Sequence, residues 1–363
     1  MRILRVAQKL YPDTKGGGQY HVHAMSRDQA ALGHDVTVVT VQSDPDLPHI
    51  ETRDGYTVIR YDPTASLLGN DISSGVAQYL ASAAEFDVMH AHSHLYFSTN
   101  LAALKRRLGD IPLAITNHGL YSQSAPENVF RLYLRTLGRW TFDQADVVFC
   151  YTETDRDRVR EFGVSSRIEV VSNGIDTNRF GSDGRESRLI NSTEPVVLFV
   201  GRLVEGKRPS VALEALPQIK RTHPDAQLYL CGDGPLRSDL ESLARELDID
   251  DSVHFLGHVP YDEMPRVYRS GDVLVLPSRA EGVPRTVLEA ISTGLPVVCS
   301  HLDQLEELVA GRGELVDLDA GESIAPRVSE WLETGQRVRS LEDDYAWQTT
   351  VERTTAHLRS IAY

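Results

Sequence analysis

Residues 278–298 read SRAEGVPRTVLEAISTGLPVV, and this stretch predicts the unit from which the fold is built. An apolar, strand-like run precedes it at residues 272–277, and another follows at residues 297–299. Between them a helix is expected from about Pro284, because proline suits the first helical turn, and Gly294 with Pro296 ends it. The order strand, loop, helix, strand is typical of an open α/β sheet, whose ligands bind at the carboxyl ends of the strands.

Two glutamates of this stretch, Glu281 in the loop and Glu289 in the helix, are candidate ligand-binding residues. Their spacing would correspond to roughly 12 Å along one helix, whereas the carboxylates of a retaining glycosidase lie roughly 5 Å apart. We therefore expect them to bind different parts of one extended ligand. The alternative is a pair of solvated glutamates without a shared ligand.

The composition limits the classes of function. A chain of 363 residues suffices for two domains, and its formal net charge of −15 argues against the broad basic surface that binds nucleic acid. Only five of its 37 basic residues are lysine, and this shortage beside abundant aspartate suggests adaptation to a salt-rich cytosol, where like charges are screened.

The cysteines and the apolar runs indicate a cytoplasmic protein. Cys150, Cys231 and Cys299 each end a strand-like run, which predicts buried thiols and no disulfide or zinc framework. No apolar run reaches the roughly 18 residues of a membrane span, and the opening MRILRVAQ is too short for a signal peptide.

The N-terminal half opens with a strand at residues 2–7, a helix at 19–32 and a strand at 35–41, and further strands are expected at 88–91, 113–116 and 147–151. Gly16, Gly17 and Gly18 stand at the first turn, where a backbone must turn sharply or approach a ligand. They do not form GxGxxG, although Asp44 lies near the position of a ribose-binding acid, so an NAD-type site is only a weak alternative.

Histidines stand at the ends of these strands. His90, His92 and His94 alternate and could share one face in a metal site, but ordinary strand-end histidines are the preferred interpretation. His118, just past the strand at 113–116, is the stronger candidate for a site residue. The alternative interpretation is that His118 is a loop histidine whose ring forms a hydrogen bond with the backbone.

A basic stripe stands out in this acidic chain. Residues 127–140 predict a helix with Arg131, Arg135 and Arg139 at i, i+4 spacing among apolar residues. Such a stripe would suit an anionic membrane surface or a phosphate-bearing acceptor. A solvated helix face paired with nearby acids is at least as good an interpretation.

Residues 173–194 have the polar, glycine-containing composition of a linker, and they separate the first series of strands from a second series. The second series is expected at 195–201, 227–231, 253–256, 273–276 and 297–299. Residues 201–208, GRLVEGKR, match the P-loop pattern except that Arg208 replaces the hydroxyl that binds Mg²⁺, so an NTPase is a weak alternative. Arg202 and Lys207 in this loop could still hold a diphosphate. The two series predict two Rossmann-like domains that face each other across a cleft.

Taken in order, these motifs resemble those of the retaining, nucleotide-sugar-dependent glycosyltransferases of the GT-B fold, family 4. The resemblance covers nearly the full length and is carried by GGG at 16–18, GH at 33–34, TNHG at 116–119, VSNGID at 171–176, GRL at 201–203 with Lys207, GDGP at 232–235, FLG at 255–257 and EGVP with LEA at 281–290. It implies an acceptor-side Rossmann-like domain at 1–175, a nucleotide-sugar-binding domain at 176–345, and a terminal helix at 346–363 that packs back on the first domain.

The resemblance also implies roles for single residues. Arg202 and Lys207 would bind the donor diphosphate and stabilise its developing charge. Glu281 would hold hydroxyls of the donor sugar, Glu289 the ribose hydroxyls, and His118 would lie by the reacting sugar. The other donor-binding residues would be Gly17, Gly18, Asn173, Gly257, His258, Val283, Pro284, Arg285 and Thr286, with Gly257 and His258 near the base. Several relatives carry Gly or Asn where this chain has Pro284 and Arg285, so this loop does not identify the sugar.

The implied activity is transfer of a sugar, with retention at the anomeric carbon, from a nucleotide-diphosphate sugar to a glycan, lipid-linked or small-molecule hydroxyl. No metal and no cofactor are implied. The alternatives are a nucleotide-sugar epimerase or hydrolase of the same fold and a non-catalytic nucleotide-sugar-binding subunit. The presence of all five motif side chains (His118, Arg202, Lys207, Glu281 and Glu289) counts against the last alternative.

Overall fold

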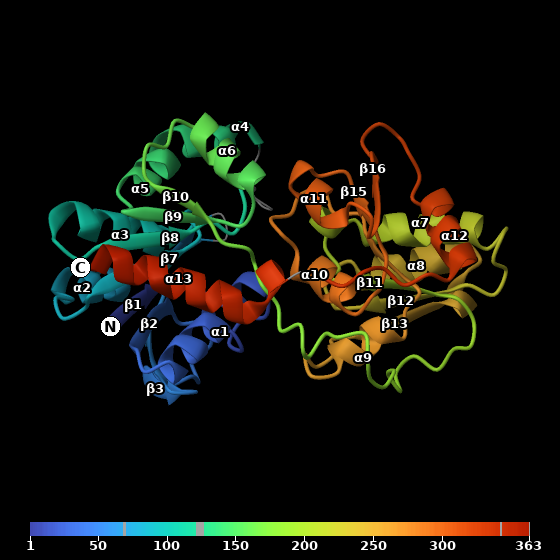
Figure 1. The fold of residues 1–363 in the computed structure, drawn as a ribbon, viewed down its shortest axis with the longest axis horizontal. Helices are drawn as coiled ribbons and strands as arrows, with labels where there is room; N and C mark the ends of the chain where they lie inside the picture. The colour runs from blue at the N-terminus through green and yellow to red at the C-terminus, as the bar shows by residue number, and fades with distance from the viewer. Residues whose placement is uncertain (68–69, 121–126, 342, 363) are drawn as a thin grey trace. The chain divides into compact units, whose positions relative to one another are not determined.

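The computed structural model describes the chain except residues 68–69, 121–126, 342 and 363, and the chain divides into two compact units (Figure 1). Unit 1 comprises Met1–Asn173 and Gln348–Tyr363, and unit 2 comprises Gly174–Trp347. None of the helices in the described ranges combines the length and the apolarity that crossing a membrane requires.

Unit 1 is built on an eight-stranded sheet in the order β10-β9-β8-β7-β1-β2-β4-β3. Its neighbouring strands run parallel, except that β3 pairs antiparallel with β4 at one edge. The strands are β1 (Arg2–Val6), β2 (Asp35–Val41), β3 (Ile50–Arg53), β4 (Tyr56–Tyr61), β7 (Val88–His92), β8 (Leu113–Thr116), β9 (Val147–Cys150) and β10 (Ile168–Val170), and β5 (Ala65–Leu67) pairs separately with β6 (Asn70–Ile72).

Helices cover both faces of this sheet, because successive strand residues point to opposite sides. Leu4 and Val6 of β1 join one apolar cluster, and Ile3 joins the other. The first cluster includes residues of α2 (Ser74–Ser82), α3 (Phe97–Leu108), α5 (Arg139–Asp143) and α6 (Glu153–Glu161), and the second includes residues of α1 (Gly17–Ala31) and α13 (Trp347–Ala362). Leu358 of α13 is fully buried there, so the C-terminal helix completes the core of unit 1.

Unit 2 contains a six-stranded parallel sheet in the order β13-β12-β11-β14-β15-β16, which is the strand order of a Rossmann fold. The strands are β11 (Val196–Val200), β12 (Gln227–Cys231), β13 (Val253–Gly257), β14 (Val273–Leu276), β15 (Val297–Ser300) and β16 (Gly313–Val316). The α-helices are α7 (Pro209–Ile219), α8 (Arg237–Glu246), α9 (Met264–Arg269), α10 (Arg285–Ser292), α11 (Glu306–Val309) and α12 (Ala325–Thr334).

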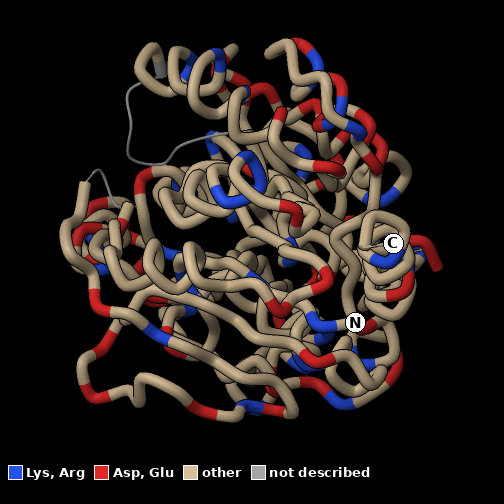
Figure 2. Tube along the Cα trace, turned by 90° about the vertical axis from the view of Figure 1, so that its left-hand side faces the viewer, with Lys and Arg blue, Asp and Glu red and all other residues tan. Residues whose placement is uncertain are grey.

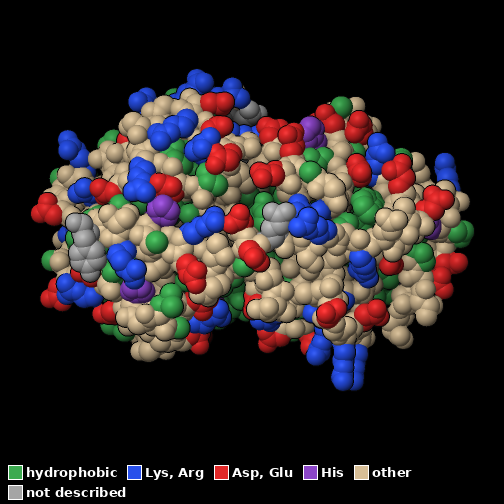
Figure 3. All heavy atoms as spheres, viewed as in Figure 1, with side chains coloured by type: hydrophobic (Ala, Val, Ile, Leu, Met, Phe, Trp, Pro, Cys, Tyr) green, Lys and Arg blue, Asp and Glu red, His purple; other side chains and the backbone are tan. Residues whose placement is uncertain are grey.

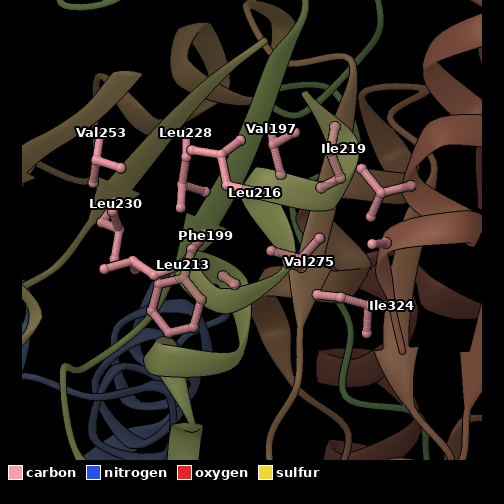
Figure 4. Packing of buried hydrophobic residues seen from close by; sticks show 14 of the residues in the cluster. Val197, Phe199, Leu213, Leu216, Ile219, Leu228, Leu230, Val253, Val275 and Ile324 are labelled. Carbon is pink, nitrogen blue, oxygen red and sulfur yellow. The ribbon is translucent and has the colours of Figure 1, made fainter. Parts of the chain in front are cut away.

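The core of unit 2 lies between the sheet and its helices. Phe199 and Val275 of the strands belong to one buried cluster with Leu216 of α7 and Ile324, which precedes α12 (Figure 4). These β-branched and aromatic strand residues suit a sheet that is covered by helices. The three cysteines are buried thiols at strand ends, as predicted.

The structure corrects one predicted helix. Residues 127–140 are not one α-helix: α4 (Glu127–Tyr133) is followed by a π-helical segment at Leu134–Gly138 and then by α5. The Tyr133 hydroxyl donates to the carbonyl oxygen of His94 (2.5 Å), and Gly138 packs against the Tyr133 ring, so tertiary contacts anchor this irregular turn. The helix of the opening stretch begins at Arg285 with Pro284 as its N-cap residue, which agrees with the expected start at about Pro284.

Acidic and basic residues are intermixed along the chain (Figure 2). On the face shown in Figure 3, Lys and Arg side chains gather over the region of α4, α5 and α6, whereas acidic and basic side chains alternate over unit 2.

Candidate functional site

In unit 2 the strand order reverses between β11 and β14, and ligands of open α/β sheets bind at such a point. Glycines let the loops there pack backbone against backbone. A Cβ on Gly232 would lie 1.9 Å from the carbonyl oxygen of Gly201, and one on Gly234 would lie 2.4 Å from that of Leu203. Gly257, with a φ of +65°, accepts a hydrogen bond at its carbonyl oxygen from the Gly232 N–H (2.8 Å).

Lys207 and Glu281 meet from the loops after these two reversing strands. The Lys207 ammonium pairs with Oε1 of Glu281, whose side chain is only 5% exposed. Nε2 of Gln304 donates to the carbonyl oxygen of Glu281 (2.5 Å) and holds that loop. Arg202 is exposed on the same loop as Lys207. Two predicted site residues, far apart in the sequence, are therefore in direct contact.

The N-terminus of α10 follows this loop. No side chain of the described residues caps it, and the Thr286 and Ser278 hydroxyls are buried without hydrogen-bond partners among those residues. Val283 and Pro284, which lead into the helix, are buried. Unpaired N–H groups and hydroxyls at a helix N-terminus suit an oxyanion such as a phosphate.

Glu289 lies inside unit 2, where it is 4% exposed. The Tyr261 hydroxyl donates to its Oε1 (3.1 Å) and the Tyr268 hydroxyl to its Oε2 (2.9 Å). Burial raises the pKa of Glu289, while Arg285 and the two hydroxyls act in the opposite direction. Sequence reasoning missed both tyrosines, whose only signal is their position before and within α9.

The contacts of Arg285 differ from those that the sequence resemblance implies. The resemblance implies a donor contact, whereas Nη1 of Arg285 here donates to the carbonyl oxygen of Gly174 (3.0 Å) and Nη2 donates to the Tyr261 hydroxyl (3.0 Å). Its side chain is 9% exposed. Arg285 therefore ties α10 to the segment that enters unit 2. His258, by contrast, is exposed directly after β13.

In unit 1 the strand order reverses between β1 and β7. Gly17 and Gly18 form the first turn of α1, and a Cβ on Gly18 would lie 3.6 Å from Nδ1 of His118. Nδ1 of His21 in the same helix lies 3.1 Å from Oδ1 of Asn173. The glycine turn and the predicted histidine therefore lie together at this end of the sheet.

Both ring nitrogens of His118 have partners. Nε2 lies 3.1 Å from Nδ1 of His92, and Nδ1 lies 2.8 Å from the Tyr151 hydroxyl. Burial lowers the pKa of His118 to about 4, so its imidazole is neutral at pH 7. Sequence reasoning missed Tyr151, although its place directly after β9 is at the same carboxyl edge.

His90, His92 and His94 are all buried; the ring centroids of His90 and His92 lie 4.4 Å apart, whereas His94 has separate surroundings. His90 Nε2 lies 2.7 Å from Thr116 Oγ1, and the His94 ring centroid lies 4.7 Å from that of Phe142. Burial lowers the pKa of all three, to about 3 for His94. Within the described ranges, three potential metal ligands come within 4.8 Å of one another only at the exposed side chains of His301, Asp303 and Glu306.

Comparison with known families gives two matches that together span most of the chain. The model of Glycosyltransferase Family 4 matches residues 15–179, and that of Glycosyl transferases group 1 matches residues 182–344. A glycogen synthase of Mycobacterium tuberculosis is 31% identical over 375 residues, which cover 95% of this chain and 87% of that protein. A GDP-mannose-dependent alpha-(1-6)-phosphatidylinositol monomannoside mannosyltransferase of Mycolicibacterium smegmatis is 26% identical, covering 93% and 94%.

Solved structures share the fold at lower identity. A sucrose-phosphate synthase of Thermosynechococcus elongatus superposes with a TM-score of 0.81 at 20% identity, covering 99% of both chains. An Anabaena protein solved in complex with UDP-glucose gives a TM-score of 0.73 at 19% identity, covering 99% of this chain and 100% of that one.

Proposed function

The chain belongs to the glycosyltransferases, through the Family 4 and group 1 models that match its two halves, and from this premise we propose the reaction that it catalyses. A sugar moves from a nucleotide-diphosphate sugar to a hydroxyl of a glycan, lipid-linked or small-molecule acceptor, with retention at the anomeric carbon and without a metal ion. The named donor of the mannosyltransferase relative and the UDP-glucose bound to the Anabaena protein support a nucleotide-sugar donor.

The observation that carries this proposal is the assembly at the switch point of unit 2. Lys207, Glu281 and the N-terminus of α10 converge there, with the hydroxyl of Thr286, which has no hydrogen-bond partner among the described residues. Arg202, Lys207 and the helix N-terminus would bind the donor diphosphate, and Glu281 would hold sugar hydroxyls. The Lys207–Glu281 ion pair keeps both charges in place before the donor binds.

We assign the remaining roles as follows. Glu289 binds the ribose hydroxyls in exchange for a tyrosine hydroxyl, Gly257 and His258 meet the base, and His118 lies by the reacting sugar. Gly17, Gly18 and Asn173 complete the donor-binding set.

The chemistry follows from these charges. The bond between the anomeric carbon and the phosphate oxygen breaks, and its electron pair leaves with the diphosphate. The acceptor oxygen bonds to the anomeric carbon on the face that the leaving group vacates, and its proton passes to a phosphate oxygen. Fixed cations lower the barrier because they are aimed where negative charge develops. A neutral His118 is not the base in this scheme.

The test is release of nucleoside diphosphate from a panel of nucleotide sugars, with and without acceptor mixtures and with and without chelator. We expect one donor to be used, chelator to have no effect, and Lys207→Ala to lower the rate at least about 100-fold. Lys105→Ala, on α3 of unit 1, is the matched control and should leave the rate unchanged. Loss of activity with chelator would overturn the metal-free mechanism.

The same assay separates the alternatives. Release of nucleoside diphosphate only with an acceptor supports transfer, whereas release without one supports a hydrolase. Binding of a donor without turnover under any condition would instead support a non-catalytic subunit. Proton NMR of the first product formed gives the anomeric configuration, and an inverted product would contradict retention.

We also propose that the surface formed by α4, the π-helical segment and the start of α5 contacts an anionic lipid surface. Val129, Leu132 and Leu137 are 52%, 65% and 43% exposed there, and Arg131, Arg135 and Arg139 are exposed among them. Exposed apolar side chains beside arginines suit a membrane interface. The π-helical segment interrupts the predicted i, i+4 stripe, so the arginines do not lie on one regular helix face.

Sedimentation with lipid vesicles tests this contact. We expect binding to vesicles of phosphatidylcholine with phosphatidylglycerol, and weaker binding to phosphatidylcholine alone or at high salt. Leu132→Asp and Arg135→Glu should each reduce binding, whereas Arg327→Glu on α12 of unit 2 should not. Equal recovery of all variants with both vesicle types would contradict a specific surface.

A further inference from the structure

The Glu289 carboxylate of unit 2 has a different tyrosine partner on each of its two oxygens. The Tyr268 hydroxyl donates to Oε2 (2.9 Å), and the Tyr261 hydroxyl donates to Oε1 (3.1 Å). Nε of Arg285 lies 3.6 Å from the same Oε1. Glu289 is 4% exposed, and a buried carboxylate needs such donors. The two oxygens therefore have distinct surroundings, one facing a tyrosine alone and one facing a tyrosine and an arginine.

The two tyrosines differ in burial. Tyr268 lies in α9, is fully buried and packs against the ring of Phe180, with the ring centroids 6.0 Å apart. Tyr261 precedes α9 and is half-buried, and the Arg179 guanidinium lies 4.6 Å from its ring centroid. A ligand that enters from the surface therefore meets Tyr261 before Tyr268. Of the two hydroxyls, that of Tyr261 is the one that a ligand can replace.

The charge of Glu289 depends on the same neighbours. Burial raises its pKa, whereas Arg285, the Tyr268 and Tyr261 hydroxyls and Arg179 act in the opposite direction. The ionised carboxylate suits a diol, because both of its oxygens accept hydrogens, whereas a protonated carboxyl uses one oxygen as a donor. A hydroxyl that donates to the charged form therefore favours the state that binds ribose.

We propose that Tyr268 is a positioning residue that fixes Glu289 through Oε2, so that Oε1 is presented to the ribose hydroxyls and Tyr261 is the group that they displace. The proposal rests on the proposed function, in which Glu289 binds the ribose. A carboxylate that is held at one oxygen keeps its orientation while the other oxygen changes partner, so it is pre-organised for the diol. Tyr268 thereby contributes to the selection of ribose without contacting the donor.

Binding of nucleoside diphosphates tests this positioning without any assay of transfer. Calorimetry with UDP, GDP and ADP identifies the preferred base, and that compound is then compared with its 2′,3′-dideoxy analogue, which keeps the base and the phosphates. The wild type should bind the analogue roughly 10- to 100-fold more weakly, because the analogue cannot donate to a charged acceptor. Tyr268→Phe should lower this ratio about fivefold, by weakening the binding of the ribonucleotide more than that of the analogue.

Two further variants separate positioning from a general effect on the fold. Tyr229→Phe in β12 removes the hydroxyl of a buried tyrosine other than the two that bind Glu289, and it should leave the ratio unchanged. In a Glu289→Gln background, Tyr268→Phe should not lower the ratio further, because it acts through the carboxylate. Equal weakening of the ribonucleotide and its analogue in Tyr268→Phe would leave the ratio unchanged and would overturn the proposal.

The pH dependence of the ratio gives a second readout. Without the Tyr268 hydroxyl the pKa of Glu289 rises further, because its charged form loses a donor. As the pH is lowered from about 8 to about 5.5, the ratio should therefore fall at a higher pH in Tyr268→Phe than in the wild type. The phosphates titrate alike in both compounds and cancel. Coincident profiles would refute the positioning, whereas a wild type that binds none of the nucleoside diphosphates would refute the proposed function itself.

Discussion

At the scale of single residues, burial decides what the ionisable groups can do. His118 was identified from its place after a strand, but its neutrality follows from burial, which lowers its pKa to about 4. Glu289 is enclosed by two tyrosine hydroxyls, and Lys207 is held by Glu281. The spacing of residues in the sequence shows none of these contacts, because each joins elements at least twenty residues apart.

His94 provides a residue-scale prediction. Both of its ring nitrogens are buried without hydrogen-bond partners among the described residues, and burial lowers its pKa to about 3. We expect His94→Phe to stabilise unit 1 by about 1–2 kcal/mol at pH 7, because it removes an unsatisfied polar ring. Below the unfolded pKa of about 6.5 the unfolded wild type binds a proton that the folded state refuses, so the wild type loses up to about 1.4 kcal/mol per pH unit until pH approaches 3.

Thermal unfolding between pH 7.5 and 5 checks this expectation. The gap in Tm between His94→Phe and the wild type should widen as the pH falls below 6.5. His223→Phe, in unit 2, serves as the control for the loss of a histidine outside unit 1. A gap that stays constant across this range would mean that His94 is not held neutral.

At the scale of elements, glycines set how closely the loops of unit 2 approach one another. The strand–helix pattern was predictable because it depends on local periodicity. The packing of the loop after β12 on the loop after β11 was not predictable from the sequence, because it depends on which strands are neighbours in the sheet. The structure of residues 127–140 was not predictable from local periodicity either. There the Tyr133 hydroxyl contacts His94, and a π-helical segment replaces part of the regular helix.

Gly232 provides an element-scale prediction. Its φ is +144°, and a Cβ would lie 1.9 Å from the carbonyl oxygen of Gly201. This oxygen can move away only if the backbone itself moves. Gly232→Ala should therefore destabilise unit 2 by about 2–4 kcal/mol, measured by urea unfolding. Gly206→Ala, where a Cβ meets nothing within 4 Å, should change stability by less than about 0.5 kcal/mol. Equal stability of the two variants would show that the loops separate without cost.

At the scale of the whole molecule, the chain returns to unit 1 after completing unit 2. Leu358 fills the core of unit 1, and Nε2 of Gln29 donates to Oγ1 of Thr355 (2.9 Å). The net charge of −15 also acts at this scale, because it sums over both units. We propose that the protein is adapted to a salt-rich solution, in which the repulsion between its many acids is screened.

A salt series tests this proposal. Raising KCl from 0.1 M to 2 M shortens the screening length from about 10 Å to below about 3 Å. We expect Tm to rise, by roughly 2–4 °C for each kcal/mol of repulsion that is removed. Parallel measurements in sucrose control for stabilisation that does not involve charge. A Tm that is the same at both KCl concentrations would refute the proposal.

The sequence by itself determined the α/β class, the Rossmann-like strands of both halves and the family, because periodicity, turn glycines and ordered motifs are local properties of the chain. It also identified Lys207, Glu281, Glu289 and His118 as candidates. Only the tertiary structure decided that Lys207 and Glu281 form a pair, that Arg285 faces Gly174, and that Tyr151 and His92 hold His118. These contacts depend on strand order and burial, which place residues side by side without regard to their distance along the chain.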